Sequence, residues 1–195
     1  MEVELIQATP NPLKLITDVA SICYGREEAT YPEKLLKHLN DLGHHSVFEH
    51  VYYTFKISGI STACLGQLTR HRHASYSVRS QRYCDESNFK AIVPNKIWDD
   101  KELRDKFYKT METVGICYDE LIEAGIKRED ARSVLPRAVS TDLYMSMNLR
   151  ELIHIYNLRT SSAAQEEIKK LATTMVGLVM YTHKDLQPLF KGEKE

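Results

Sequence analysis

Hydrophobic and polar residues alternate in two parts of the chain in the manner of β-strands. Near the N-terminus, Val3 and Leu5 stand between glutamates, and the strand predicted there ends before the first prolines. Residues 51–57 are almost all β-branched or aromatic and predict a second strand, which Ser58-Gly59 would end as a turn. The stretch 136–147 also has the pattern of extended backbone. A few short strands are therefore expected.

Apolar residues recur every three or four positions in two segments before the second strand, which is the pattern of amphipathic helices. The first segment follows Asn11, which suits the helix cap, and Pro12, which suits the first helical position; Gly25 is suited to end it. The second segment carries the leucines of residues 35–42 and ends at Gly43, where a left-handed conformation is expected. Two helices are predicted here.

Further helical patterns follow the second strand. A short helix is predicted to start at Ser61 or Thr62. A long amphipathic helix is predicted from about Lys101 to Ala124, just before Gly125. We expect this long helix to belong to the core and scaffold.

Two capping boxes mark the last helices. Asn148 and Glu151 stand in this relation at the start of a helix that reaches about Arg159. Ser162 and Gln165 stand in it before the final helix, which stops ahead of the last proline.

The mixture of a few strands and several helices, without regular βαβ alternation, predicts the α+β class. We expect a single compact domain over residues 1–195, with a small, mostly antiparallel sheet flanked by helices. The motifs G-x-G-x-x-G and G-x-x-x-x-G-K-[ST] are both absent. The fold is therefore not expected to be a Rossmann fold, and a bound dinucleotide would be held by side chains and helix ends.

Composition narrows the function. The chain has 195 residues, 43% of them hydrophobic, and a formal net charge of −1, which argues against bulk binding of nucleic acid or anionic lipid. Its longest apolar runs span only a few residues, no signal-peptide pattern opens it, and its four cysteines form no C-x-x-C pair. We expect a cytoplasmic protein with reduced thiols, no membrane role and no nucleic-acid partner. Any anion site must be local.

One segment is suited to such a site. Residues 70–83 contain four arginines, two histidines and three serines but no acidic residue. Arginine forks match phosphate oxygens, and serine hydroxyls add donors, so a nucleotide phosphate is the natural ligand. Composition alone leaves two alternatives open, a solvated basic loop and a nucleic-acid contact.

The order of residues in this segment is more specific. Arg70-His71-Arg72, seven residues, and then Ser80-Gln81-Arg82-Tyr83 resemble the signature of flavin-dependent thymidylate synthases. Residues 43–50 (Gly-His-His-Ser-Val-Phe-Glu-His) are similar to that family's G-H-x-[ST]-x-x-E-H element, and residues 129–136 to its E-x-A-R-x-x-L-P element. Further matching segments are 148–152, 157–159, 164–165 and 167–168.

The resemblance implies an activity and an assembly. It implies reductive methylation of dUMP to dTMP, with methylenetetrahydrofolate as the carbon donor and NADPH-reduced FAD as the hydride source. FAD would be the cofactor, with NADPH and methylenetetrahydrofolate as co-substrates. The active sites would be shared between the subunits of a homotetramer.

It also implies site residues. Those for FAD are Ser46, Arg70, His71, Arg72, Val78, Asn148, Leu149, Arg150 and His154. Those for dUMP are Gln67, Leu68, Thr69, Arg70, Val78, Arg79, Ser80, Gln81, Arg82, Arg132 and Arg159. A role in cofactor and substrate access is implied for His44.

Arg159 is the predicted catalytic residue. By favouring the polarised or N3-ionised form of the uracil ring, it would activate C5 as a carbon nucleophile. Considered alone, an arginine at this place also complements the helix macrodipole. Arg150 and His154 are four residues apart and so share one helix face, and Asn148 lies at the N-terminus of the same helix, which favours an anion.

The chain departs from the family pattern at two places. Ser77-Val78 stands where many members have Asn-Glu, which removes a carboxylate from the flavin or dUMP contacts, although one branch carries a similar variant. Ala163 replaces a histidine found in some members.

Two other functions fit part of the sequence. A nucleotide- or RNA-binding module would use the arginine-rich segment and stack bases on Tyr76 or Tyr83. A metalloenzyme would draw its ligands from the histidines, but these lack H-E-x-x-H or paired Cys/His spacing, and no metal site is expected. The histidines concerned are His44, His45, His50, His71 and His73.

Overall fold

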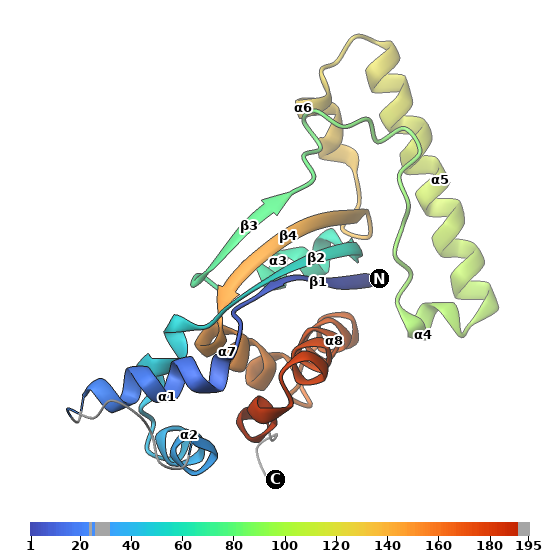
Figure 1. Cartoon of the computed structure of the whole chain (residues 1–195). Coiled ribbons are helices and arrows are strands. Elements are labelled where there is room, and N and C mark those ends of the chain that lie inside the picture. The colour runs from blue at the N-terminus through green and yellow to red at the C-terminus, as the bar shows by residue number, and fades with distance from the viewer. Residues whose placement is uncertain (24, 26–31, 191–195) are drawn as a thin grey trace.

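The sheet has four strands in the order β1-β2-β4-β3, and every neighbouring pair is antiparallel (Figure 1). The structure is a computed structural model that describes residues 1–23, 25 and 32–190. The strands are β1 (Glu2–Ala8), β2 (Tyr52–Ser61), β3 (Ala74–Val78) and β4 (Ser140–Asn148). The predicted α+β class with a small antiparallel sheet is confirmed.

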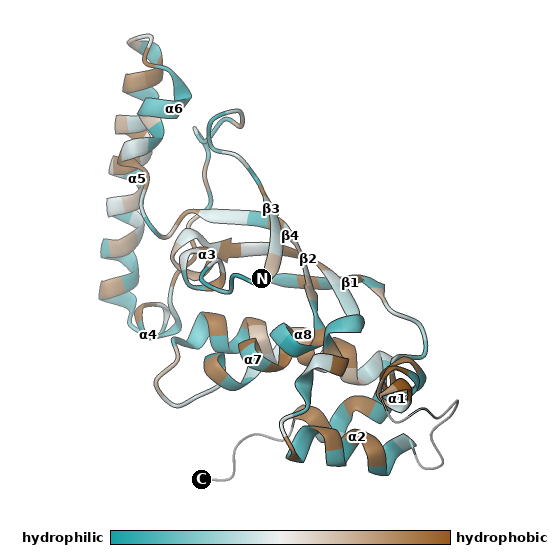
Figure 2. Cartoon of the chain, turned by 90° about the vertical axis from the view of Figure 1, so that its left-hand side faces the viewer, coloured by the Kyte–Doolittle hydropathy of each residue, from teal (hydrophilic) through white to brown (hydrophobic). Residues whose placement is uncertain are grey.

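Helices α7 and α8 cover one face of this sheet and build the core with it (Figure 2). Along β4 the side chains alternate, so that Leu143, Met145 and Met147 are buried while Tyr144 is 48% exposed. The same period places Tyr53, Phe55 and Ile57 of β2 in the core. Opposite them, the other sheet face carries polar and aromatic side chains open to solvent, as is common for an antiparallel sheet. The residues of β2 named here belong to one continuous buried cluster.

The helices surround the sheet in three groups. Those at the N-terminal side are α1 (Pro12–Ile22), α2 (Pro32–Asp41) and the 3-10 helix η1 (His45–His50). Those that project or connect are α3 (Thr62–Leu68), α4 (Asn95–Trp98), α5 (Lys101–Glu123), α6 (Arg128–Ala131) and η2 (Arg132–Val134). Those of the C-terminal part are α7 (Leu149–Arg159), α8 (Glu166–Thr182) and η3 (Lys184–Phe190). None of the helices described is long and apolar enough to cross a membrane.

Local signals in the N-terminal half were partly right. Helix α1 starts at Pro12 as predicted, but Asn11 is left-handed (φ 48°) and its side chain makes no capping bond. The predicted turn at Ser58-Gly59 is wrong, because β2 continues through it. The register with β4 shifts between Ile57 and Ile60, and Gly59 has a φ of +72°. A bulge of this kind uses the glycine without ending the strand.

The capping predictions for the last helices had different outcomes. Asn148 caps α7 as predicted, and Ser61 caps α3. The second box is wrong, since α8 begins at Glu166 and Gln165 makes no capping bond there. Ser162 lies in a turn outside the helix. The sequence pattern also gave no strand for residues 74–78, which form β3.

The prediction that the long helix belongs to the core is wrong. Helix α5 stands away from the sheet, with α4 and α6 at its ends (Figures 1 and 2). Among its residues only Tyr118 is fully buried, and Ile116 and Leu103 are 55% and 49% exposed. Its apolar stripe is therefore only half covered within one chain.

Candidate active site

Helix α7 begins where β4 ends, and this junction carries several of the predicted cofactor residues. Asn148 Oδ1 accepts a hydrogen bond from the N–H group of Glu151 at 2.9 Å, which caps the helix. The N–H group of Leu149 donates to the carbonyl oxygen of Val51 at 2.8 Å, and the Leu149 side chain is buried. Arg150 points outwards, with 54% of its side chain exposed. The cap thus fixes which residues of the first turn face solvent.

Beneath this junction, side chains distant in sequence form a chain of hydrogen bonds. The Nε–H group of Arg159 donates to Nε2 of His71 at 2.9 Å, and its Nη2 group donates to the carbonyl oxygen of Gln67, also at 2.9 Å. On the other side of the ring, Nδ1 of His71 lies 3.1 Å from a carboxylate oxygen of Glu151. His71 is 3% and Glu151 6% exposed. We call Gln67, His71, Glu151 and Arg159 the α7 region.

The buried position determines the charge of the histidine. Burial, with the charges of Arg159 and His154 as lesser causes, lowers the pKa of His71 to about 4. The imidazole is therefore neutral near pH 7. Burial also raises the pKa of Glu151. The guanidinium of Arg159 consequently faces a neutral ring and not a second cation.

The backbone that carries this histidine is held from two sides. The hydroxyl group of Tyr76 lies 2.8 Å from the carbonyl oxygen of Leu68 and 2.9 Å from that of His71, and burial raises the pKa of Tyr76, so the hydroxyl remains a donor. The amide of Gln67 donates to the side-chain oxygen of Gln165 ahead of α8. The carbonyl group that orients Arg159 is therefore part of a fixed loop.

Two arginines on either side of the buried histidine remain available. Arg70 and Arg72 are exposed, and within the described residues neither makes a hydrogen bond or ion pair. A pair of guanidinium groups without a carboxylate partner favours an anionic ligand. The interpretation of this segment as an anion site is thus supported by its geometry.

A cavity of about 550 Å³ opens at the start of α7. It is lined by Asn148, Arg150 and His154 from the predicted cofactor set, and by His45, Glu49 and His73 among other residues. Arg150 forms an exposed ion pair with Glu49 of η1. A neighbouring hollow of about 310 Å³ is lined by Ser46, His44 and the same Arg150. The predicted cofactor residues from η1 and α7 therefore gather around one surface.

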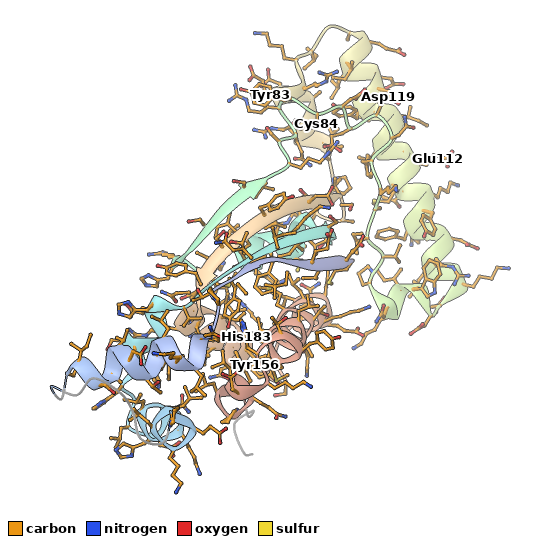
Figure 3. All side chains as sticks on the ribbon, viewed as in Figure 1. Tyr83, Cys84, Glu112, Asp119, Tyr156 and His183 are labelled. Atoms are coloured by element: carbon orange, nitrogen blue, oxygen red, sulfur yellow. The ribbon has the colours of Figure 1, made fainter. Side chains whose placement is uncertain are left out.

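The remaining predicted substrate residues lie elsewhere. Ser80, Gln81 and Arg82 follow β3, and the segment continues through Tyr83 and Cys84, which are labelled in Figure 3, next to α6 in the same view in Figure 1. Arg82 donates from Nη2 to Glu129 at 2.7 Å and from Nε at 3.1 Å, and Arg132 donates to the carbonyl oxygen of Glu129. In Figures 1 and 2 the sheet separates α6 from α7. We call Ser80, Gln81, Arg82, Glu129 and Arg132 the α6 region.

The side chains of several predicted substrate residues are engaged in contacts within the protein. Leu68 is 1% exposed and packs in the core. Val78 ends β3 opposite Leu143. Arg79 pairs with the buried carboxylate of Glu86. Thr69 donates its hydroxyl hydrogen to the carbonyl oxygen of Leu65. Any ligand contact by Leu68 or Leu149 would have to come from the backbone.

The metal alternative gains no support. Among the described residues, one group could offer three ligand atoms to a metal ion, namely His71, Glu151 and His154. Of the five histidines considered from the sequence, it contains only His71. Both nitrogens of that ring are already hydrogen-bonded, and one of them faces the cation Arg159. A positive ion would be repelled there.

Sequence reasoning missed three carboxylates at the site. The capping box predicts only a helix-start role for Glu151, whereas its side chain also bonds His71. The motifs that contain Glu49 and Glu129 predict no partner for either residue, yet the two carboxylates pair with Arg150 and Arg82. The available signal was that Glu151 and Glu129 stand in the same motifs as Arg150 and Arg132, whereas the motif of Glu49 contains no arginine.

An α+β fold with two arginine clusters and no glycine-rich loop has the features of a protein class that would hold nucleotide anions with side chains. The family can be named more closely from comparisons with known proteins. The family model of the thymidylate synthase complementing protein, Thy1, matches residues 4–183. This chain therefore belongs to the thymidylate synthase complementing protein family.

Relatives and a solved structure agree with this assignment. The flavin-dependent thymidylate synthase of Pyrococcus furiosus is 40% identical over all of this chain and 84% of its own length. That of Geobacter sulfurreducens is 40% identical over 92% of this chain and 82% of its own length. The crystal structure of thymidylate synthase X from Helicobacter pylori with FAD and dUMP matches with a TM-score of 0.79 and 26% identity, covering 98% of this chain and 97% of that chain.

Proposed function

We propose that this chain is a flavin-dependent thymidylate synthase that converts dUMP to dTMP. The one-carbon unit of methylenetetrahydrofolate is transferred to C5 of dUMP, and NADPH supplies the electrons through FAD, so that dTMP, tetrahydrofolate and NADP⁺ are released. The observation that carries the proposal is the fixed guanidinium of Arg159, which His71 and Gln67 hold, with the available Arg70 and Arg72 on either side of His71 in the chain. The names of the relatives support the same activity.

The residues around the start of α7 fit a flavin dinucleotide. The exposed Arg70 and Arg72, the exposed Arg150 and the helix N-terminus supply cationic and N–H donors for a diphosphate. Ser46 and His154 line the adjoining surface. When bound, FAD supplies hydride chemistry that no side chain of this protein can provide. The role of these residues is to bind and orient it.

Arg159 is the proposed catalytic residue. Its Nε and one Nη2 hydrogen are used by His71 and Gln67, which leaves its other N–H groups for the uracil of dUMP. A guanidinium remains charged at all working pH values and favours negative charge on the uracil ring. That charge makes C5 a nucleophile. Arg82 and Arg132 of the α6 region are proposed to bind the phosphate or the base edge of dUMP.

We propose that the complete site is formed between copies of the chain in a homotetramer. One chain holds the α7 and α6 regions on different sides of its sheet, so a second copy has to bring an α6 region to an α7 region. The half-covered apolar stripe of α5 supports such an assembly, because Ile116 and Leu103 are exposed in a single chain. The four cysteines, which are all free thiols, support a cytoplasmic location.

An absorbance spectrum and an assay test this function. The purified protein, with FAD added if needed, is expected to show a flavin spectrum. Under anaerobic conditions with dUMP, methylenetetrahydrofolate and NADPH it is expected to form dTMP, and none in matched reactions that lack dUMP or NADPH. A protein that binds no FAD would contradict the assignment. Flavin binding without dTMP would identify a diverged flavoenzyme and direct attention to Val78 and Ala163.

A further inference from the structure

Glu151 is a buried carboxylate to which none of the roles above assigns a task. It is the third residue of α7, and its backbone N–H group is already capped by Asn148. Its side chain turns inwards, where 7% of it is exposed, and meets Nδ1 of His71. A carboxylate is costly to bury unless it accepts hydrogen bonds. The buried carboxylate of Glu151 therefore needs a hydrogen-bond donor as its partner, and the carboxylate in turn orients that donor.

The position of the histidine proton follows from Arg159. A guanidinium has only donors, so Nε2 of His71 must be the acceptor of the 2.9 Å bond from Nε–H of Arg159. Because the ring is neutral, its single proton lies on Nδ1, and that N–H group donates to Glu151. The direction of both hydrogen bonds is therefore fixed. Arg159 donates to His71, and His71 donates to Glu151.

We propose that Glu151 is a positioning residue that acts through His71 to hold the Arg159 guanidinium in the orientation in which it meets the uracil of dUMP. The inference rests on the proposed function, since it assigns Arg159 its catalytic task. The carboxylate fixes the tautomer and ring angle of His71 and strengthens Nε2 as an acceptor, as carboxylates do for histidines in other sites. Glu151 itself does not touch the substrate.

Removing the carboxylate would disturb all three groups. The Nδ1–H group of His71 would be buried without an acceptor, which favours a rotated ring or the other tautomer. In the other tautomer, Nε2–H would face Nε–H of Arg159, donor against donor. Arg159 would then keep only its bond to the Gln67 carbonyl oxygen and regain side-chain freedom.

Other charged groups around the ring do not offer a substitute. His154 lies on the next turn of α7, and the centre of its ring is 5.5 Å from that of His71. His73, in the segment before β3, interacts electrostatically with Glu151. Tyr76 of β3 donates to backbone carbonyl groups. In the described part of the chain none of these groups bonds Nδ1 of His71, whereas a carboxylate oxygen of Glu151 lies 3.1 Å from it.

A double-mutant cycle with Glu151→Ala and Arg159→Lys tests the proposal. In protein saturated with FAD, Glu151→Ala is expected to lower kcat/KM for dUMP by about 10- to 100-fold, as for loss of a charge-assisted hydrogen bond. Glu151→Gln keeps an acceptor oxygen and should lose less than Glu151→Ala. In the Arg159→Lys background, Glu151→Ala should have little further effect on kcat/KM or on the dUMP Kd. A full effect in both backgrounds, or none in either, overturns the proposal.

Two further measurements make the outcome decisive. Glu167→Ala is the matched control, because Glu167 is a half-buried carboxylate that bonds Ser61 and has no contact with Arg159; it should lower Tm but act additively with Arg159→Lys. Nitrogen-15 NMR of histidine-labelled protein reads the tautomer directly. A proton on Nδ1 of His71 supports the proposal, whereas a proton on Nε2 near pH 7 overturns it even if the wild-type protein forms no dTMP. Absence of dTMP with the wild-type protein counts against the proposed function alone.

Discussion

The α7 region and the α6 region both present arginines, but they hold them in opposite ways. Arg159 is bound to a neutral, buried histidine and to a backbone carbonyl group, so its charge is oriented without being neutralised. Arg82 is paired with Glu129, and 52% of its side chain is exposed. A buried donor network is difficult to rearrange, whereas an exposed ion pair contributes little and exchanges readily. The first arrangement suits catalysis and the second suits ligand capture.

The largest effect is expected from removing the fixed guanidinium. Arg159→Ala should lower kcat by about 10²- to 10³-fold, in the range known for loss of one donor that stabilises developing charge. Flavin binding should persist. Arg82→Ala is the comparison variant and should raise KM for dUMP more than it lowers kcat. Steady-state dTMP formation by both variants checks this, and an equal loss of kcat would remove the distinction between the regions.

The next effect should come from α5. Ile116→Glu places a charge on an apolar side chain that is 55% exposed in the single chain, and should separate the subunits and abolish most dTMP formation. Thr110→Glu, at an exposed polar position of the same helix, is the control. Sedimentation velocity and activity are measured together. An Ile116→Glu protein that remains a fully active tetramer would show that α5 does not hold the two regions together.

Acid should damage the α7 region first. His71 takes up a proton at about pH 4 in the folded protein but near 6.5 when unfolded, so its contribution to stability is complete above 6.5 and declines as the pH falls towards 4. The raised pKa of Glu151 acts in the opposite sense, because its folded form is protonated earlier. Protonation also places a hydrogen on Nε2 of His71, so that this nitrogen can no longer accept the hydrogen bond from Nε–H of Arg159. Activity should fall steeply near pH 4 to 5, and a stability maximum in that range would contradict this.

The smallest effect is expected at the exposed pair. Glu129→Gln should change the free energy of unfolding by less than about 0.5 kcal/mol, since exposed pairs contribute little. By freeing Arg82 it should lower KM for dUMP a few-fold. Denaturant unfolding and initial rates provide the comparison. A large loss of stability would mean that Glu129 is a structural partner of Arg82.

Local chemistry in the sequence predicted most elements of the fold. The helix starts at Pro12, Ser61 and Asn148 could be predicted, because a helix start depends on backbone and side-chain properties that act over only a few residues. The turn predicted at Ser58-Gly59 was wrong because Gly59 lies in a bulge, and this bulge results from the pairing of β2 with β4. The core role predicted for α5 was wrong because an apolar stripe does not show whether the surface that covers it belongs to the same chain. Both errors concern contacts between distant segments.

The same limit applies to the site. The motif order located the arginines, and the resemblance supplied their proposed ligands. It could not show that Glu151 and His71, 80 residues apart, share a hydrogen bond, nor that the arginines fall into two regions. Those facts depend on how the segment between α3 and β3, which carries His71, meets α7, and no spacing in the sequence encodes this contact.

Mixing two impaired proteins tests the central claim most directly. Arg159→Ala protein lacks a working α7 region and Arg82→Ala protein a working α6 region, so dissociation and joint reassembly should place intact regions together in about a quarter of the sites on random mixing. With dUMP held below the wild-type KM, where both variants are slow, activity should rise towards that fraction of the wild-type value, while each variant reassembled alone stays low. No recovery in mixed tetramers of demonstrated composition would mean that both regions act within one chain, and would contradict the account.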